Sequence, residues 1–243
     1  MKPFLQEIIA IVPAAGIGSR MQAQCPKQYL PLADSCILSV TLNVLLSHPA
    51  ISRVIVALNP NDVVFPTLPE ANHPKLTQVI GGAERVDSVV AALKQLGETD
   101  VWALVHDAAR PCLTHQDIDK LIASQAQFPQ GAILAAPVRD TMKRANANGC
   151  IETTVPREAL WHALTPQFFP AMPLLNALQQ AVAAGVNVTD EASAMEWRGV
   201  APGLVSGRAD NIKVTHPDDL PLAELYLSHH KALTRAETSA VTE

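Results

Sequence analysis

Short apolar runs rich in β-branched residues alternate with segments of helical periodicity, and this alternation constrains the fold more than any other feature of the chain. The runs expected to be strands are residues 7–12, 53–58, 76–80, 101–105, 131–136, 186–188, 203–205 and 211–214. Several are apolar throughout, which is typical of strands covered on both faces. Helical segments, such as 84–96 and 114–128, separate them. The pattern predicts an α/β fold with a mainly parallel sheet flanked by helices.

The chain of 243 residues has no internal repeat or obvious linker, so we expect a single domain over residues 1–232 and a flexible tail over 233–243. One polar segment, 139–160, breaks the alternation. It contains Asn148-Gly149, a dipeptide that favours a hairpin turn between two strands. Two interpretations stay open: a solvated excursion from the domain, or a β-arm that packs on a partner subunit.

Composition excludes several classes of function. The net charge is −5 and the isoelectric point is near 5.9, without the basic stripe that a nucleic-acid-binding protein would show. No window reaches the roughly 18 consecutive apolar residues of a membrane span. The N-terminal segment lacks the basic start and long apolar run of a signal peptide. We therefore expect a cytoplasmic protein that binds neither nucleic acid nor membrane.

The loop after the first expected strand has the composition of an anion site. Gly16 and Gly18 let the backbone turn tightly, so that successive N–H groups can point into one concavity that suits phosphate oxygens. The dinucleotide fingerprint G-x-G-x-x-G fails because Met21 stands where the third glycine is required. The P-loop motif fails because the loop has no Gly-Lys pair.

Two cations, Arg20 and Lys27, follow these glycines in a chain with 18 lysines and arginines in total. Two positive charges beside one loop suit a polyphosphate better than a single phosphate, because the charge of a polyphosphate is larger and more spread. We therefore expect a nucleoside triphosphate site here. The alternative is an ordinary tight turn between a strand and a helix.

Polar residues also follow other expected strands, at the edge of the sheet where ligands bind in folds of this class. Asp107 and Arg110 come after 101–105. Beside a triphosphate, the carboxylate of Asp107 would be a ligand for Mg²⁺, and otherwise it would be a turn former. Gly82 and Ser88 follow 76–80, where bare backbone and a hydroxyl could meet a nucleotide base.

Three further residues have both a site interpretation and an ordinary one. Thr189 begins the segment TDEASAME and can be the N-cap of a helix. Lys213 falls in the expected strand 211–214, where a buried lysine would need a partner. Arg157 follows the hairpin and can equally be a surface residue.

Together these segments resemble the 2-C-methyl-D-erythritol 4-phosphate cytidylyltransferase family. The motifs that carry the resemblance are AAGIGSRM, PKQYL, GGAERVDSV, VHDAARP, APVRDTMKR, LWHALTPQFF, TDEASAME and GRADNIKVT, and they cover residues 8–227. The first motif is shared with many nucleotidyltransferases, whereas VHDAARP, TDEASA and GRADNIKVT are more specific.

The resemblance implies a Rossmann-like nucleotidyltransferase fold and a homodimer whose β-arm reaches the other subunit. It implies that Mg²⁺ assists transfer of CMP from CTP to 2-C-methyl-D-erythritol 4-phosphate, with release of diphosphate, in non-mevalonate isoprenoid biosynthesis. The implied CTP contacts are Ala14, Ala15, Gly16, Gly18, Arg20, Lys27, Gly82, Ser88 and Asp107, the last also holding the metal. The implied sugar-phosphate contacts are Asp107, Arg110, Thr141, Arg157, Thr165, Thr189 and Lys213, with Thr141, Arg157 and Thr165 donated across the dimer.

We expect catalysis to come from Arg20, Lys27, Arg157 and Lys213, because the attacking phosphate is already ionised and needs no protein base. Ala83 departs from the family, in which an aspartate often follows the glycine pair, so selectivity for cytosine would depend on backbone and Ser88. Two other functions remain possible. One is transfer of the nucleotide to another alditol or sugar phosphate such as ribitol 5-phosphate, and the other is nucleotide sensing without catalysis.

Overall fold

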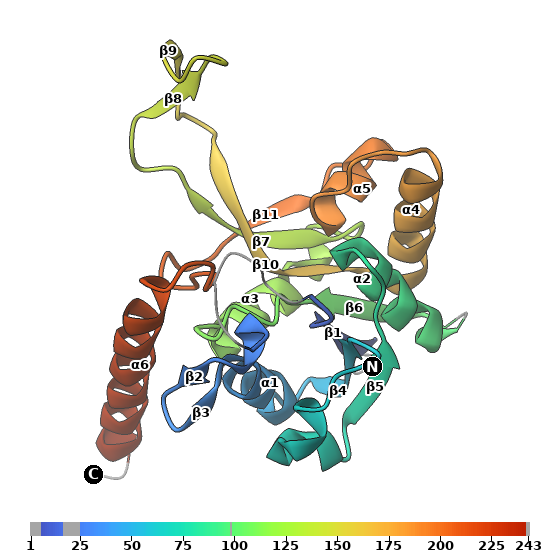
Figure 1. Cartoon of the computed structure of the whole chain (residues 1–243), viewed down its shortest axis with the longest axis vertical. Coiled ribbons are helices and arrows are strands. Elements are labelled where there is room, and N and C mark those ends of the chain that lie inside the picture. The colour runs from blue at the N-terminus through green and yellow to red at the C-terminus, as the bar shows by residue number, and fades with distance from the viewer. Residues whose placement is uncertain (1–5, 17–24, 98, 242–243) are drawn as a thin grey trace.

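The structure of the chain, a computed structural model, describes residues 6–16, 25–97 and 99–241, with side chains as far as residue 233. Its centre is a seven-stranded sheet with the order β11-β7-β10-β6-β1-β4-β5 (Figure 1). The seven strands are β1 (Glu7–Pro13), β4 (Ile51–Leu58), β5 (Leu76–Ile80), β6 (Val101–Val105), β7 (Ala132–Pro137), β10 (Trp161–Pro170) and β11 (Gly203–Ser206). Two pairs lie outside it: β2 (Pro31–Leu32) with β3 (Ser35–Cys36), and β8 (Met142–Ala145) with β9 (Ile151–Val155).

Helices cover both faces of the sheet. They are α1 (Ile37–Ser47), α2 (Arg85–Leu93), α3 (His115–Ala123), α4 (Ala171–Ala183), α5 (Glu191–Trp197) and α6 (Asp219–Val241). Short 3₁₀ helices are η2 (Lys27–Tyr29), η3 (Phe65–Thr67), η4 (Pro69–Asn72), η5 (Lys94–Leu96) and η6 (Ser124–Ala126). Among the described residues, no helix is both long enough and apolar enough to cross a bilayer.

The continuous apolar character of the strands follows from this layering. Successive side chains of a strand point to opposite faces of the sheet. In β1, Ala10 packs with one apolar cluster that includes α1 and α3, and Ile11 packs with another that includes α2, α4 and α5. Both faces are therefore buried, as the sequence predicts.

One strand runs against the rest, and it shapes the site. β1 pairs in parallel with β4 and β6, β4 with β5, and β7 with β11, whereas β10 is antiparallel to both β6 and β7. Gln167 of β10 lies opposite Val105, the last residue of β6. The residues just before Gln167 therefore lie beside those that follow β6.

Most sequence predictions of strands and helices are confirmed. Six of the eight expected strands form, with small shifts of their ends. The structure describes 186–188 and 211–214 and assigns neither to a strand; in the second, Val214 donates one isolated backbone hydrogen bond to Ala109 rather than joining a ladder. β10 was not among the expected strands. The helix expected at 114–128 is α3 followed by η6, and it begins with a capping box between Thr114 and Asp117.

The polar segment 139–160 forms an arm that projects from the sheet (Figure 1). β7 and β10 pair as far out as Pro137 and Trp161, and β8 and β9 form the hairpin beyond them. At the other end of the chain, the segment expected to be a flexible tail is helical as far as Val241, in continuation of α6. The tail contains Ala, Leu, Arg and Glu, which favour helix.

Candidate active site

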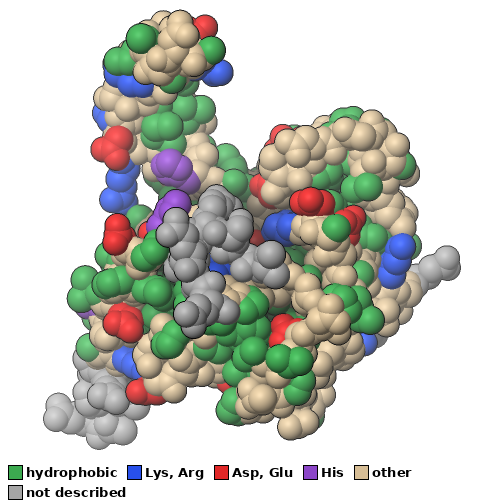
Figure 2. Space-filling model, viewed as in Figure 1, with side chains coloured by type: hydrophobic (Ala, Val, Ile, Leu, Met, Phe, Trp, Pro, Cys, Tyr) green, Lys and Arg blue, Asp and Glu red, His purple; other side chains and the backbone are tan. Residues whose placement is uncertain are grey.

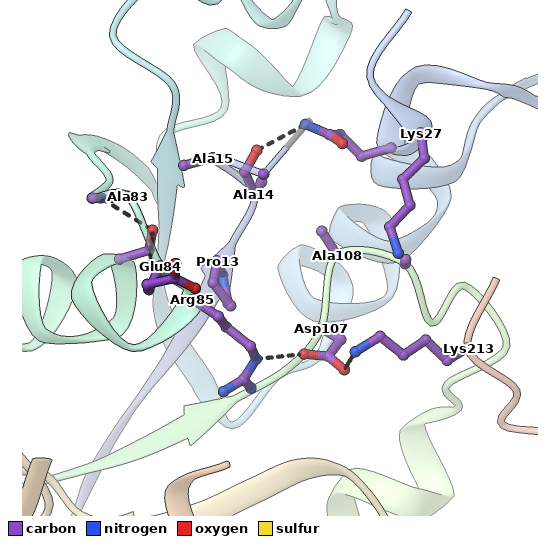
Figure 3. A pocket seen from close by; sticks show the side chains of 15 residues that line it. Pro13, Ala14, Ala15, Lys27, Ala83, Glu84, Arg85, Asp107, Ala108 and Lys213 are labelled. Atoms are coloured by element: carbon purple, nitrogen blue, oxygen red, sulfur yellow. Dashed lines mark hydrogen bonds and ion pairs between the residues drawn. The ribbon is translucent and has the colours of Figure 1, made fainter. Parts of the chain in front are cut away.

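A cavity of about 250 Å³ opens at the carboxyl edge of the sheet. Three strand ends line it: residues 13–16 at the end of β1, 82–85 and Ser88 after β5, and 107–109 after β6, together with Lys27, Gln28 and Lys213 (Figure 3). Within the sheet, β1 has β4 on one side and β6 on the other, and the chain continues from β1 to β4. Such a divergence is where ligands bind in open α/β sheets.

The first strand end is held in place from both sides. The N–H of Ala14 donates to the carbonyl of Ala57 at 2.8 Å, and the side-chain amide of Gln28 donates to the carbonyl of Ala14 at 2.8 Å. Gln28 is buried, so this contact is shielded from water. Ala15 and Gly16, two of the expected CTP contacts, follow along the cavity wall. Gly18 and Arg20, two of the expected nucleotide contacts, lie outside the described residues.

Lys27 reaches the cavity from η2, directly after Pro26. Its ammonium group donates to the carbonyl of Val214 at 3.3 Å, in the segment that also carries Lys213. This contact places a cation from the first part of the chain next to one from the last part.

The glycine pair after β5 allows two loops to touch. A Cβ on Gly81 would lie 2.6 Å from the Cβ of Ala15 and 2.7 Å from the hydroxyl of Ser88. The buried Ser88 hydroxyl accepts the N–H of Gly82 at 3.2 Å. Ser88 lines the cavity, and it also fixes the turn that brings Gly82 and Ala83 there.

Asp107, directly after β6, gathers three cations. Its Oδ1 accepts from Nε of Arg85 at 2.9 Å, its Oδ2 accepts from Nζ of Lys213 at 2.8 Å, and Nε of Arg110 lies 3.6 Å from Oδ2. Burial by itself would raise the pKa of Asp107, but Arg85, Lys213 and Arg110 outweigh it and hold the pKa well below its usual range. Asp107 is therefore ionised, and its carboxylate holds the side chains of these three cations beside the cavity.

Thr165 lies beside Asp107 of its own chain, because Gln167 of β10 pairs with Val105 at the end of β6. Its buried hydroxyl accepts the N–H of Asp107 at 3.1 Å and lies 3.0 Å from Nδ1 of His106. The expectation that Thr165 is donated across a dimer is therefore wrong.

The buried His106 completes this network and was missed from the sequence. Its Nε2 lies 3.0 Å from the carbonyl of Arg110, which can only accept, so Nε2 carries the proton and Nδ1 accepts from Thr165. Burial lowers the pKa of His106 to about 4, with a backbone hydrogen bond to Arg110 acting in the opposite direction. A neutral His106 thus fixes the loop that carries Asp107 and Arg110.

The remaining expected sugar-phosphate residues do not line the cavity described above. Thr189 is exposed and precedes α5, whose N-cap is Asp190 rather than Thr189. Thr141 and Arg157 are exposed on the arm, and the guanidinium of Arg157 donates to the carbonyl of Arg139. Arg110 points inward and also donates to the carbonyl of Asn211 at 2.7 Å.

Arg85 and Glu191 are two further residues that sequence reasoning did not single out. Arg85 lines the cavity and joins Asp107 to Glu191, although 106 positions separate it from Glu191 along the chain. Both residues lie within quoted motifs, GGAERVDSV and TDEASAME, but neither motif reveals that the two side chains meet.

The sequence of this chain is similar to those of known proteins from one enzyme family. Residues 8–229 match the family model described as 2-C-methyl-D-erythritol 4-phosphate cytidylyltransferase. A protein of that name from Shewanella amazonensis is 71% identical over 221 residues, which are 90% of this chain and 93% of that protein. A second, from Shewanella oneidensis, is 66% identical and covers 96% of this chain and 93% of its own length.

Solved structures give the same result. A Francisella tularensis structure described as 2-C-methyl-D-erythritol 4-phosphate cytidylyltransferase superposes with a TM-score of 0.79 at 34% identity, covering 90% of this chain and 99% of that one. One from Thermus thermophilus, with the same description, has a TM-score of 0.74 at 28% identity, covering 90% and 98%. The chain therefore belongs to the 2-C-methyl-D-erythritol 4-phosphate cytidylyltransferase family.

Proposed function

We propose that this protein transfers CMP from CTP to 2-C-methyl-D-erythritol 4-phosphate, which yields 4-diphosphocytidyl-2-C-methyl-D-erythritol and diphosphate for isoprenoid biosynthesis. The observation that carries the proposal is the cavity at the carboxyl edge of the sheet, where Arg85, Arg110 and Lys213 lie against the carboxylate of Asp107 and Lys27 lines the same cavity. Family membership names the two substrates, and the cavity has the charge that two phosphate-bearing molecules require.

The reaction is a displacement at the α-phosphorus of CTP by a phosphate oxygen of the acceptor. That oxygen is ionised near neutral pH, so no protein group has to remove a proton from it. The barrier is electrostatic, because two anions approach and charge grows on the leaving diphosphate. Positioned cations in a partly enclosed site lower such a barrier, typically by several kcal/mol in total.

The roles divide between the two ends of the cavity. Lys27, together with Arg20, which lies outside the described residues, would bind the triphosphate and stabilise the transition state. Lys213 and Arg110 would bind the acceptor phosphate. Gly82 and Ser88 would border the cytosine, while Thr165 holds the Asp107 backbone rather than offering its proton to a substrate.

The residues present fit a magnesium ion that is held mainly by substrate. Among the described residues, no group of three His, Cys, Asp or Glu side chains could hold a metal. Mg²⁺ is commonly bound by one or two carboxylates together with substrate phosphates, and Asp107 is a cavity-lining carboxylate suited to that part. When bound, the ion would neutralise charge on the phosphate oxygens of CTP.

The arm supports a homodimer in which Thr141 and Arg157 complete the acceptor site of the other subunit. Met142, Ile151 and Trp161 are exposed on the arm, and Figure 2 shows hydrophobic and basic side chains over its surface. Exposed apolar side chains grouped on a projecting hairpin mark an interaction site. Thr189, exposed before α5, would contact the sugar phosphate from this chain. We place the enzyme in the cytoplasm.

Diphosphate release by the purified protein tests the proposal. The assay contains Mg²⁺, CTP and 2-C-methyl-D-erythritol 4-phosphate, and each is omitted in turn. Release that requires all three supports the proposed reaction. Release with ribitol 5-phosphate in preference to methylerythritol phosphate would contradict the acceptor, and CTP binding without release on any acceptor would contradict catalysis.

A further inference from the structure

Arg85 lines the cavity and joins Asp107 to Glu191 through two ion pairs. Its Nε donates to Oδ1 of Asp107 at 2.9 Å, while its Nη1 and Nη2 donate to the two carboxylate oxygens of Glu191 at 2.7 and 3.1 Å. Figure 3 shows Arg85 and Lys213 approaching Asp107 from opposite sides. One guanidinium thus bridges the start of α2, the end of β6 and the start of α5.

The position of Arg85 is not explained by the stability of its own helix. Arg85 is the first residue of α2, where the helix dipole disfavours a positive charge. The carboxylates of Asp107 and Glu191 offset this unfavourable placement. A cation maintained there by residues from two other elements points to a role outside α2.

Glu191 prevents Arg85 from moving away. Its side chain is 1% exposed, and Arg85 satisfies both carboxylate oxygens. Releasing Arg85 would leave a buried charge without a partner, which is strongly unfavourable. Glu191 is itself fixed, since a capping box between Asp190 and Ser193 starts α5 and Gln167 accepts the N–H of Ala192 at 2.8 Å.

Lys213 differs from Arg85 in its freedom to exchange partners. Its side chain is 38% exposed and ends a flexible stem, whereas that of Arg85 is 29% exposed and held by three hydrogen bonds. An incoming dianionic phosphate can therefore take Lys213 from Asp107 without disturbing Arg85. The three cations Arg85, Arg110 and Lys213 exceed the two carboxylates of Asp107 and Glu191 by one positive charge, which is available to that phosphate.

We propose that Arg85, anchored by Glu191, is a positioning residue that holds Asp107 in place while Lys213 passes to the acceptor phosphate. Asp107 orders Lys213 before the acceptor arrives, and Arg85 remains as the partner of Asp107 when Lys213 leaves. The inference rests on the proposed function. It extends that function to two residues that need not touch either substrate.

Glu191→Gln tests this role, with Glu196→Gln as its matched control. Both substitutions remove one negative charge from α5, but Glu196 is exposed. Glu191→Gln should lower kcat/KM for the sugar phosphate at least tenfold, while the dissociation constant for CTP, measured by calorimetry, stays within twofold of wild type. Glu196→Gln should match wild type in both measurements.

Arg85→Lys is a second variant, used in case Glu191→Gln fails to fold. It keeps a positive charge beside the buried Glu191. A lysine cannot make the two-pronged contact and also reach Asp107, so we expect the same selective loss of kcat/KM. Loss below twofold in both variants would overturn the inference. The inference would also be overturned if CTP binding weakened by the same factor as kcat/KM for the sugar phosphate. Arg85 and Glu191 would then support the whole cavity rather than the acceptor site. An inactive wild type in the same assay would instead overturn the proposed function.

Discussion

Lys27 shows how a single residue serves two parts of the site. It lines the cavity and at the same time donates to the Val214 carbonyl next to Lys213. A preorganised cation of this kind stabilises a transition state because it needs no rearrangement as charge develops. The same contact contributes little to folding, since the side chain lies at the rim of an open cavity.

Lys27→Ala should therefore reduce turnover far more than stability. Loss of one preorganised donor raises a barrier by about 2–4 kcal/mol, so we expect kcat to fall by roughly 1.5 to 3 orders of magnitude. Lys94→Ala, which removes the same charge at an exposed position of η5, is the control. Diphosphate release and thermal melting of both variants measure the two effects. Near-normal turnover of Lys27→Ala would remove this residue from the catalytic group.

His106 predicts how stability depends on pH. Its pKa is about 4 in the folded protein against an ordinary value of 6.5, so protonation favours the unfolded chain. The contribution of the neutral ring is complete above pH 6.5 and is lost as the pH falls toward 4, by up to about 3 kcal/mol.

Comparison of wild type with His106→Gln isolates this contribution, because glutamine does not titrate. Denaturant unfolding at pH 7, 5.5 and 4 should show a difference in stability between the two proteins that shrinks by roughly this amount toward pH 4. A difference that stays constant across this range would show that His106 does not control acid stability.

At the scale of elements, hydrophobic periodicity predicted strands and helices that depend on their local sequence. It failed for segments whose structure depends on pairing with residues distant in the chain. The strands at 76–80 and 101–105 were predicted with the ends that β5 and β6 have. Val101–Val105 is apolar throughout, and Leu76–Ile80 ends at the glycine pair Gly81-Gly82. β10 was missed because Pro166 and Pro170 interrupt its pattern. The expected strand at 211–214 has suitable residues, but its backbone forms no ladder. The side-chain amide of Asn211 donates to the Thr165 carbonyl, and the N–H of Val214 donates to the Ala109 carbonyl.

The same limit applies to the site. Residues that follow strands, such as Asp107 and Gly82, could be placed from sequence because the ends of parallel strands meet at one edge. The pairing of Arg85 with Glu191 could not, since it depends on how α2 and α5 lie beside the sheet. Thr165 was assigned to the wrong subunit because the direction of β10 was not known.

Gly131 tests packing at the opposite edge of the sheet. It has a φ of +115°, and a Cβ there would lie 2.0 Å from Cδ1 of Phe169. Gly185, with a φ of +70° and no heavy atom within 4 Å of such a Cβ, has the strain without the clash. Gly185→Ala should cost about 1–2 kcal/mol, and Gly131→Ala about 1–3 kcal/mol more.

Chemical unfolding of the two variants measures this difference directly. Because β7 is parallel to β6, Gly131 lies at the amino end of its strand, away from the cavity. Turnover per folded molecule should therefore remain close to wild type in both. Equal destabilisation of the two variants would mean that Phe169 gives way without cost.

At the scale of the whole molecule, the arm raises the question of which chain completes each site. Arg157 is exposed on the arm, whereas Lys27 and Lys213 belong to the cavity at the sheet edge. If the proposed homodimer forms, the arm of one subunit can bring Arg157 to the acceptor site of the other. Arg157→Ala should then raise KM for the sugar phosphate and leave CTP binding unchanged, because the arm contributes nothing to the nucleotide end.

Mixed dimers decide whether Arg157 acts across the interface. When chains carrying Arg157→Ala and Lys27→Ala are unfolded and refolded together in equal amounts, about half of the dimers contain one of each. In such a dimer, one cavity has an intact Lys27 and receives an intact Arg157 from its partner, so activity should recover to about one quarter of the wild-type level. Mixing Lys27→Ala with Lys213→Ala is the control, because both residues belong to the same cavity and every site keeps a defect. Recovery in the first mixture and none in the second establishes a shared site, whereas two inactive mixtures would confine Arg157 to its own chain.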